Sequence, residues 1–284
     1  MAYKQRHDGR NWTEARPITA KAGVIAEADG SAFFQIGKTA AYAAVYGPRE
    51  LFPKFMQNQK QGILRCNYSM MPFSGMGERV RPGPSRRSKE ISLVTEQALI
   101  SAIDLTEFPN AVVDVFIELP QTDAGSRCAG ICAAAIALAD AGITMKDLVS
   151  AVSVGVVEDK ILVDLDYAEE AHEEGHVADI PVAMLPSSGQ VTLLQMDGIV
   201  EPEQLKKAIG LARDACLKIR EKQQEALLNK YRDLTKKHGL DYDKLLAEAA
   251  EEKEASPQDG QQPVSGGSDE NFEEVLDEEG ETNA

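Results

Sequence analysis

The run "CAGICAAAIALADAG", residues 128–142, restricts the fold of this chain more than any other stretch. Its side chains are almost uniformly small and apolar, so a helix made from it has no polar face and is expected to be buried. Gly142 predicts where this helix ends. The run is shorter than the roughly 20 residues of a membrane span. It therefore predicts a helix in the core of a folded domain.

The segments before this helix carry strand and helix patterns. Apolar runs on both sides of Asp29–Gly30 predict a hairpin, so the N-terminal third is expected to be antiparallel sheet. Residues 88–105 repeat apolar side chains at three- and four-residue spacing, which predicts an amphipathic helix capped by Ser85 or Ser88.

A strand is predicted at residues 111–119, directly before the buried helix. After that helix, residues 151–166 and 180–196 each form two apolar runs around a short turn, which predicts two further hairpins. From Glu201 to about residue 235, apolar residues on one face predict a long helix that packs on the rest. This order of elements indicates an α+β fold, with antiparallel or mixed sheets and packed helices.

The net charge of −16 is concentrated at the C-terminal end of the 284 residues. Residues 251–284 hold 12 acidic residues against Lys253, a local charge of −11, which leaves −5 for residues 1–250. A weak overall bias of that size is compatible with basic patches. The acidic segment has too few apolar residues to order itself, so we expect one domain over 1–250 and a disordered tail over 251–284.

The cysteines and the N-terminus indicate the compartment. Cys66, Cys128, Cys132 and Cys216 show no C-x-x-C pairing, so they are expected to be reduced core residues. The first residues lack the apolar core of a secretory signal. We therefore expect a cytoplasmic protein with no membrane partner.

The stretch "HEEGH", residues 172–176, matches the H-E-x-x-H pattern of zinc hydrolases. In those enzymes both histidines share one face of an amphipathic helix. Here acidic residues surround the motif, and about 12 residues separate the neighbouring strands, too few for such a helix. A solvated acidic loop is favoured, and a zinc hydrolase using His172, Glu173 and His176 is the alternative.

A second motif match is weaker. "GKT" at residues 37–39 resembles the end of a phosphate-binding P-loop, but that loop needs a glycine where this chain has Ala32. We expect no nucleotide site there.

The turn "AGSR", residues 124–127, joins the predicted strand to the buried helix. Gly125 allows close approach of the backbone, Ser126 is able to cap the helix, and Arg127 adds a fixed set of donors. Free amides at a helix N-terminus bind dianions such as phosphate. The turn therefore indicates either a phosphate site or plain helix capping.

Arg86 and Arg87 lie at the predicted start of the amphipathic helix, where the helix dipole disfavours cations. Their position suggests a bound anion, with two solvated surface arginines as the alternative.

Several collinear motifs together resemble the RNase PH family, most closely its catalytic subunits in the archaeal exosome. The resemblance spans roughly residues 5–235 and rests on "RHDGRNWTEARPI", "PSRRSKEI", "DVFIELPQTDAGSR", "ALADAGI", "VDLDY" and "ADIPVAM". It implies an RNase PH-like fold, similar to domain 2 of ribosomal protein S5.

The resemblance implies phosphorolysis of single-stranded RNA from its 3′ end, releasing nucleoside diphosphates and reversible to tail synthesis. Inorganic phosphate is then the co-substrate. Gly125, Ser126, Arg127 and Arg87 match the family's phosphate site, and Arg86 the RNA backbone contact. Asp179 matches the catalytic aspartate, as a general acid or as a ligand of Mg²⁺ or Mn²⁺.

The second acid of the family site is ambiguous here. Counting six residues back from Asp179 gives Glu173, whereas counting forward from Tyr167 gives Glu170. The loop between Tyr167 and Asp179 is about three residues longer than in the family pattern, and the added residues create "HEEGH". Glu173 is our predicted second catalytic residue, with Glu170 as the alternative.

The loop at residues 47–62 resembles the family segment that lines the neck of a hexameric ring. Lys54 is the predicted RNA contact, and Arg65 on the following strand is a second one. The implied partners are a related inactive subunit, forming a ring of three heterodimers, and RNA-binding cap subunits. We expect no DNA partner.

One further alternative is that this chain is the non-catalytic scaffold of the same ring. Retention of the arginines at 86, 87 and 127 together with Asp179 argues against it, because a scaffold has no need of them.

Overall fold

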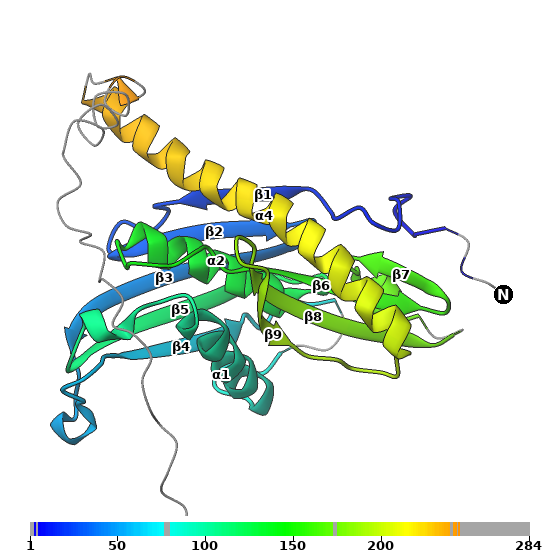
Figure 1. Ribbon diagram of the computed structural model, residues 1–284, viewed down its shortest axis with the longest axis horizontal. Coiled ribbons are helices and arrows are strands. Elements are labelled where there is room, and N and C mark those ends of the chain that lie inside the picture. The colour runs from blue at the N-terminus through cyan, green and yellow to red at the C-terminus, as the bar shows by residue number, and fades with distance from the viewer. Residues whose placement is uncertain are drawn as a thin grey trace, which may run out of the picture. The chain divides into compact units, whose positions relative to one another are not determined.

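The computed structural model describes residues 3, 5–76, 80–172, 175–238, 241, 242 and 244. The chain divides after Gly239, and the helices and strands below all belong to the first unit, residues 1–239 (Figure 1). The segment 251–284, predicted to be disordered, lies outside the described residues. Within the described part, no helix combines the length and the apolar character needed to cross a membrane.

The first sheet contains five strands in the order β1-β2-β3-β5-β4. They are β1 (Ile18–Ala22), β2 (Gly30–Ile36), β3 (Thr39–Glu50), β4 (Ile63–Met70) and β5 (Ala111–Gln121). Neighbours pair antiparallel except β4, which runs parallel to β5. The predicted antiparallel N-terminal sheet is therefore correct for β1 to β3, and the whole sheet is mixed.

The predicted hairpin around Asp29–Gly30 is formed, but with a different turn. β1 and β2 pair antiparallel across residues 23–29, and Gly30 already belongs to β2. The Asp29 carboxylate instead accepts the Gly47 N–H at 2.7 Å. The tight turn lies one strand later, between β2 and β3, where Gly37 has a φ of 56° that favours glycine.

The second sheet contains four antiparallel strands in the order β7-β6-β8-β9. They are β6 (Ser150–Val157), β7 (Lys160–Val163), β8 (Val177–Leu185) and β9 (Gln190–Leu194). β6 with β7 and β8 with β9 confirm both predicted hairpins.

The buried helix is α2 (Ser126–Asp140), and 13 of its 15 residues are buried. It packs against β2 and β3 of the first sheet and β6 of the second, so both sheets share it as a common core (Figure 1). The chain leaves the helix through Ala141 and Gly142, which has a φ of 77°. The buried helix and its glycine stop are confirmed.

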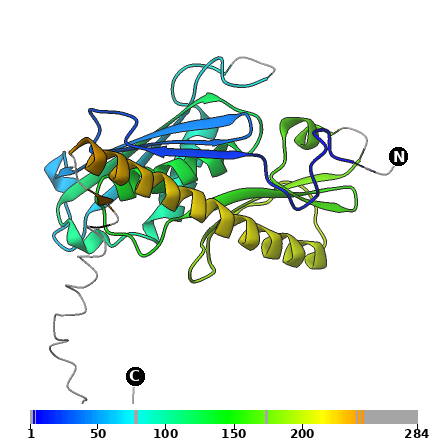
Figure 2. The same ribbon diagram turned by 90° about the horizontal axis from the view of Figure 1, so that it is seen from above.

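The remaining helices cover the sheets. α1 (Arg86–Ile100) packs on β4, and its cap uses both predicted serines, because Ser85 and Ser88 bond reciprocally. The long helix α4 (Pro202–Lys237) crosses β1 and β6 and so reaches both sheets (Figure 2). The described part of the unit also contains three short helices: η1 (Lys54–Met56), η2 (Leu105–Glu107) and α3 (Tyr167–Glu170). All four cysteines are free and buried, as predicted.

Candidate functional site

A cavity of about 470 Å³ opens where the N-termini of α1 and α2 meet α3 and β8. Its polar wall combines cations from one side with carboxylates from the other. The charged lining residues are Arg81, Arg87, Arg127, Glu170, Asp179 and Asp197. The site is therefore able to hold an anion beside proton-donating groups.

The anion side is built on the turn before α2. Ala124 and Gly125 have φ angles of 55° and 60°, and Gly125 is the N-cap, so it offers no capping side chain. Ser126 is the first helical residue rather than the cap that we predicted. The first-turn amides of α2 thus receive no side-chain cap, which leaves them for a ligand that approaches the helix end.

Thr39 stabilises this turn through hydrogen bonds to its backbone. Its hydroxyl donates to the Ala124 carbonyl at 2.7 Å and accepts the Asp123 N–H at 2.9 Å. The threonine is fully buried. The "GKT" segment that we rejected as a nucleotide motif therefore supports the cradle indirectly.

Arg127 is fixed at the cavity edge. Its guanidinium donates to the Gln195 side-chain oxygen and lies 3.8 Å from the Glu90 carboxylate. The Gln195 amide also donates to Glu90 at 3.0 Å, so the three side chains form one cluster. Their contacts orient the arginine fork before any ligand arrives.

Two other arginines face the cavity without such partners. Arg87 and Arg81 line it, both are exposed, and neither forms an ion pair with any residue that the structure describes. Arg86 is also exposed but lies outside the lining. Sequence reasoning missed Arg81, because it stands in a loop with no helix or strand pattern to fix its direction.

Asp179 projects from β8 into the acidic side of the cavity. Burial raises the pKa of its carboxyl, while the hydroxyl of Ser153, which donates to it, and the nearby Arg127 oppose the rise. A raised pKa keeps more of the acid protonated near neutral pH. The shift is in the direction that favours the protonated carboxyl, the form that a general acid needs.

Glu170, the last residue of α3, shares the cavity with Asp179. Burial, followed by the charge of Asp179, raises the pKa of Glu170. The alternative second acid is thus the one found beside Asp179. Our first choice, Glu173, lies outside the described residues.

Asp197 is a third carboxylate in the lining, and the sequence analysis did not single it out. Its backbone pairs with that of Asp179 through two hydrogen bonds of 2.8 and 2.9 Å. A partial signal was available, since Asp197 directly follows the predicted strand at residues 190–196, but the pattern did not show that it lies opposite Asp179.

Neither His172 nor His176 of the "HEEGH" stretch lies in a helix, and their side chains contact different parts of the fold. α3 ends at Glu170, the His172 ring packs on Tyr3 with centroids 5.4 Å apart, and the His176 ring contacts the Ile199 carbonyl. Within the described parts of the chain, no group of three or more His, Cys, Asp or Glu side chains is arranged to hold a metal. These contacts do not favour the zinc hydrolase.

Lys54 and Arg65, the other predicted RNA contacts, lie away from the cavity lining. Lys54 is on η1, 73% exposed and 3.8 Å from Glu50. Arg65 donates to both oxygens of Asp114 at 2.7 and 2.9 Å across the β4–β5 pairing. Lys54 is the freer of the two cations.

Comparison with known families gives two adjacent matches. Residues 14–144 match the model of the 3′ exoribonuclease family, domain 1, and residues 147–215 match domain 2 of the same family. The first match contains β1 to β5 with α1 and α2, and the second contains β6 to β9. The two family domains thus correspond to the two sheets.

Relatives cover most of this chain. The exosome complex component Rrp41 of Methanopyrus kandleri is 48% identical over 226 residues, which are 80% of this chain and 93% of that protein. Rrp41 of Pyrococcus furiosus is 50% identical over 227 residues, or 80% of this chain and 89% of that protein.

Solved structures share the fold. Rice (Oryza sativa) Rrp46 matches with a TM-score of 0.67 and 25% identity over 77% of this chain and 98% of that one. A chain of the Archaeoglobus fulgidus exosome with RNA bound to the active site matches with a TM-score of 0.66 and 23% identity, over 77% and 92% respectively. The latter likeness concerns the fold alone.

Proposed function

Because this chain belongs to the 3′ exoribonuclease family, we propose that it is the catalytic subunit of an exosome ring and degrades single-stranded RNA from the 3′ end by phosphorolysis. The observation that carries the proposal is one cavity lined both by the α2 cradle with Arg87 and Arg127 and by the carboxylates of Asp179 and Glu170.

The cradle side holds inorganic phosphate. Gly125, Ser126 and the first-turn amides of α2 receive its oxygens, and Arg127 and Arg87 neutralise its charge beside the RNA phosphate. Two anions approach one another in this reaction, so dense positive potential at the site lowers the barrier. Positioning by these groups supplies most of the catalysis expected for phosphoryl transfer.

The acidic side serves the leaving group. A phosphate oxygen attacks the phosphorus of the last nucleotide, and the bond from that phosphorus to the 3′ oxygen of the preceding nucleotide breaks. Asp179 in its protonated form gives a proton to this oxygen. The products are a nucleoside diphosphate and an RNA shorter by one residue, and excess diphosphate drives the reverse reaction, tail synthesis.

We propose the same acidic side as the place of a divalent cation, which the described side chains would hold together with substrate oxygens, since no group of three or more of their His, Cys, Asp and Glu residues is arranged to hold a metal. Mg²⁺ and Mn²⁺ prefer oxygen ligands, and Mg²⁺ commonly uses one or two protein carboxylates together with substrate phosphates. Asp179 and Glu170 would hold it, and the ion would supply charge stabilisation at the leaving oxygen. Either role of Asp179 needs a carboxyl group in the cavity, and the position of Asp179 in the cavity lining supports both.

The ring and its surroundings complete the proposal. We propose a related inactive subunit as the partner in a ring of three heterodimers, with RNA-binding cap subunits above it. Lys54 contacts the RNA backbone at the neck, with Arg86 and Arg65 as further contacts. The site of action is the cytoplasm.

The test uses 5′-labelled single-stranded RNA, with the protein purified alone and co-expressed with its partner subunit. Nucleoside diphosphates released only with phosphate, and lost in Asp179→Ala, are the expected result. Monophosphates released without phosphate would instead mean hydrolysis. No product in any assembly would make this chain a scaffold.

A further inference from the structure

Asp123 lies directly before the cradle turn and contacts both halves of the site. Its carboxylate accepts the backbone N–H of Tyr167 at 3.1 Å, and Tyr167 is the first residue of α3. The same carboxylate lies 3.5 Å from the Arg16 guanidinium. Asp123 is only 9% exposed, so these contacts are largely shielded from water.

The backbone of Asp123 makes separate contacts that hold the cradle. Its N–H donates to the Thr39 hydroxyl at 2.9 Å, and its carbonyl accepts from Arg16. These bonds do not depend on which side chain stands at position 123. The side chain alone reaches α3, so the two roles of this residue are separable.

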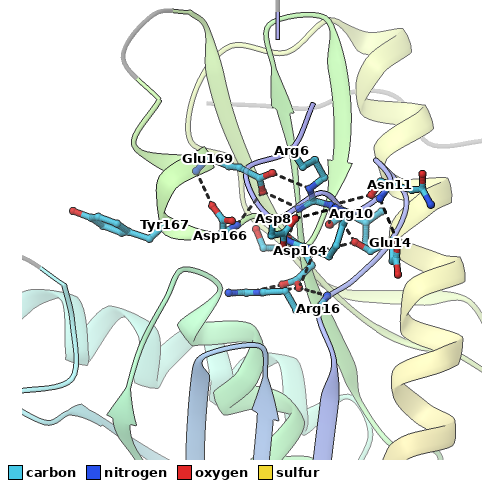
Figure 3. A network of polar contacts seen from close by, with 12 residues as sticks. Arg6, Asp8, Arg10, Asn11, Glu14, Arg16, Asp164, Asp166, Tyr167 and Glu169 are labelled. Atoms are coloured by element: carbon cyan, nitrogen blue, oxygen red, sulfur yellow. Dashed lines mark hydrogen bonds and ion pairs between the residues drawn. The ribbon is translucent and has the colours of Figure 1, made fainter. Parts of the chain in front are cut away.

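A buried network fixes the far side of α3. Figure 3 shows Arg16 bonded to Asp164 and Arg6 bonded to Glu169, which is the neighbour of Glu170. Arg6 and Glu169 are fully buried, and their nitrogen and oxygen atoms lie 2.8 Å apart. The buried ion pair therefore holds α3 at its third residue, Glu169, and the Asp123 carboxylate holds it at its first, Tyr167.

We propose that Asp123 is a positioning residue that sets the distance between the phosphate cradle and the Glu170 carboxylate. The inference rests on the proposed function and adds to it a residue that touches neither phosphate nor RNA. α3 has only four residues, from Tyr167 to Glu170, so the backbone positions of these two residues are less than about 6 Å apart along the helix axis. A bond at the first residue therefore controls where Glu170 stands.

Two substitutions and a matched control test this role. Asp123→Ala removes the bond to Tyr167, and Asp123→Asn keeps an acceptor oxygen without the charge. The control is Asp140→Ala at the opposite end of α2. Asp140 is also 9% exposed, and its carboxylate also accepts one backbone N–H, from Ser31 at 3.0 Å, and pairs with one cation, Lys230.

A second pair of variants removes the donor instead of the acceptor. Tyr167 is the first helical residue after the cap Asp166, a position where proline is well tolerated. Asp166 has φ −93° and ψ 171°, the extended geometry that a following proline favours. Tyr167→Pro lacks the N–H, whereas Tyr167→Ala keeps it, so their difference isolates this bond from the loss of the tyrosine ring.

The experiment measures kcat and the phosphate KM of the assembled ring on labelled RNA, with the melting temperature of each variant. Asp123→Ala is expected to lower kcat about 10- to 100-fold, the loss typical of misplaced reacting groups, with the phosphate KM close to wild type. Asp123→Asn recovers most of kcat. Tyr167→Pro is slower than Tyr167→Ala by a similar factor, and Asp140→Ala keeps the wild-type kcat.

Other results would overturn the inference. Equal kcat values for Asp123→Ala and Asp140→Ala, or for Tyr167→Pro and Tyr167→Ala, would show that the bond positions nothing. A raised phosphate KM with unchanged kcat would place the effect in the cradle. A wild-type ring that releases no diphosphates would overturn the proposed function and this inference with it. That failure is seen in the wild type alone, whereas failure of the inference alone is seen only in the variants.

Discussion

Glu169→Ala is expected to destabilise the protein strongly, because it leaves the buried positive charge of Arg6 without its carboxylate partner. The Glu169 carboxylate accepts two N–H bonds from Arg6, each of 2.8 Å, and the Tyr3 hydroxyl at 3.2 Å. Both charged side chains are 0% exposed. After the substitution the Arg6 guanidinium keeps its bonds to backbone carbonyls but has lost this carboxylate.

The size of the loss follows from two routes. Breaking a buried ion pair on one side costs about 3–5 kcal/mol of unfolding free energy. Counted as two charge-assisted hydrogen bonds, each worth about 1.5–3 kcal/mol, the loss is about 3–6 kcal/mol. The two estimates agree, and they represent a large share of the roughly 5–15 kcal/mol that stabilises a typical domain.

Urea unfolding followed by circular dichroism measures this loss as a lower midpoint at an unchanged slope. Glu50→Ala is the control, because it removes only exposed contacts of this carboxylate, with Lys54 at 3.8 Å and with the Gln57 amide at 3.5 Å. Its midpoint is expected to stay close to wild type. A loss below about 1 kcal/mol in Glu169→Ala, the range of exposed pairs, would refute the reasoning, since water would then have to reach Arg6.

Three further predictions concern the site. Asp179→Asn is expected to lower kcat about 10²- to 10⁴-fold. Burial raises the pKa of Asp179, so between its ordinary pKa and the raised one the folded state binds more protons than the unfolded state. Wild-type kcat and the Asp179 contribution to stability are both expected to fall as pH rises through the raised pKa, and above it urea unfolding should show Asp179→Asn at least as stable as wild type. Gly125→Ala is expected to cost about 1–2 kcal/mol and to raise the phosphate KM, because the φ of 60° disfavours a β-carbon although the nearest atom would be 3.6 Å away; a melting curve and KM like those of wild type would contradict this. Lys54→Ala is expected to reduce the slope of log affinity for RNA against log salt by about 1, measured by titration of the ring, whereas an unchanged slope would remove Lys54 from the RNA path.

Local patterns predicted much of the fold. The buried helix, its glycine stop and the two hairpins of the second sheet depend on residues close together in sequence, which composition and periodicity report directly. The parallel pairing of β4 with β5 depends on strands separated by α1, so no local signal contained it. Arg65 lies opposite Asp114 for that reason, and the sequence alone did not predict the ion pair between them.

The acidic side of the site shows the same limit. Counting across the β8–β9 turn from Leu185 opposite Gln190 would place residue 196 opposite Asp179, but a register shift between Ala183 and Met184 brings Asp197 there instead. The choice between Glu170 and Glu173 likewise depended on the length of a loop. The acidic residues themselves could be read from the sequence. Which of them lies beside Asp179 depended on strand register and loop length, where a shift of one residue changes the answer.

The pairing of Arg6 with Glu169 also has a consequence for synthesis of the chain. The two residues are 163 positions apart, so a ribosome adding about 5–20 residues per second needs about 8–30 s between them. During that interval the N-terminal segment has been made, but Arg6 still lacks the Glu169 carboxylate with which it is buried. The segment is then accessible to proteases and chaperones, while the strands of the first sheet have already been made and are able to fold. The ion pair next to Glu170 therefore forms late in the folding of the chain.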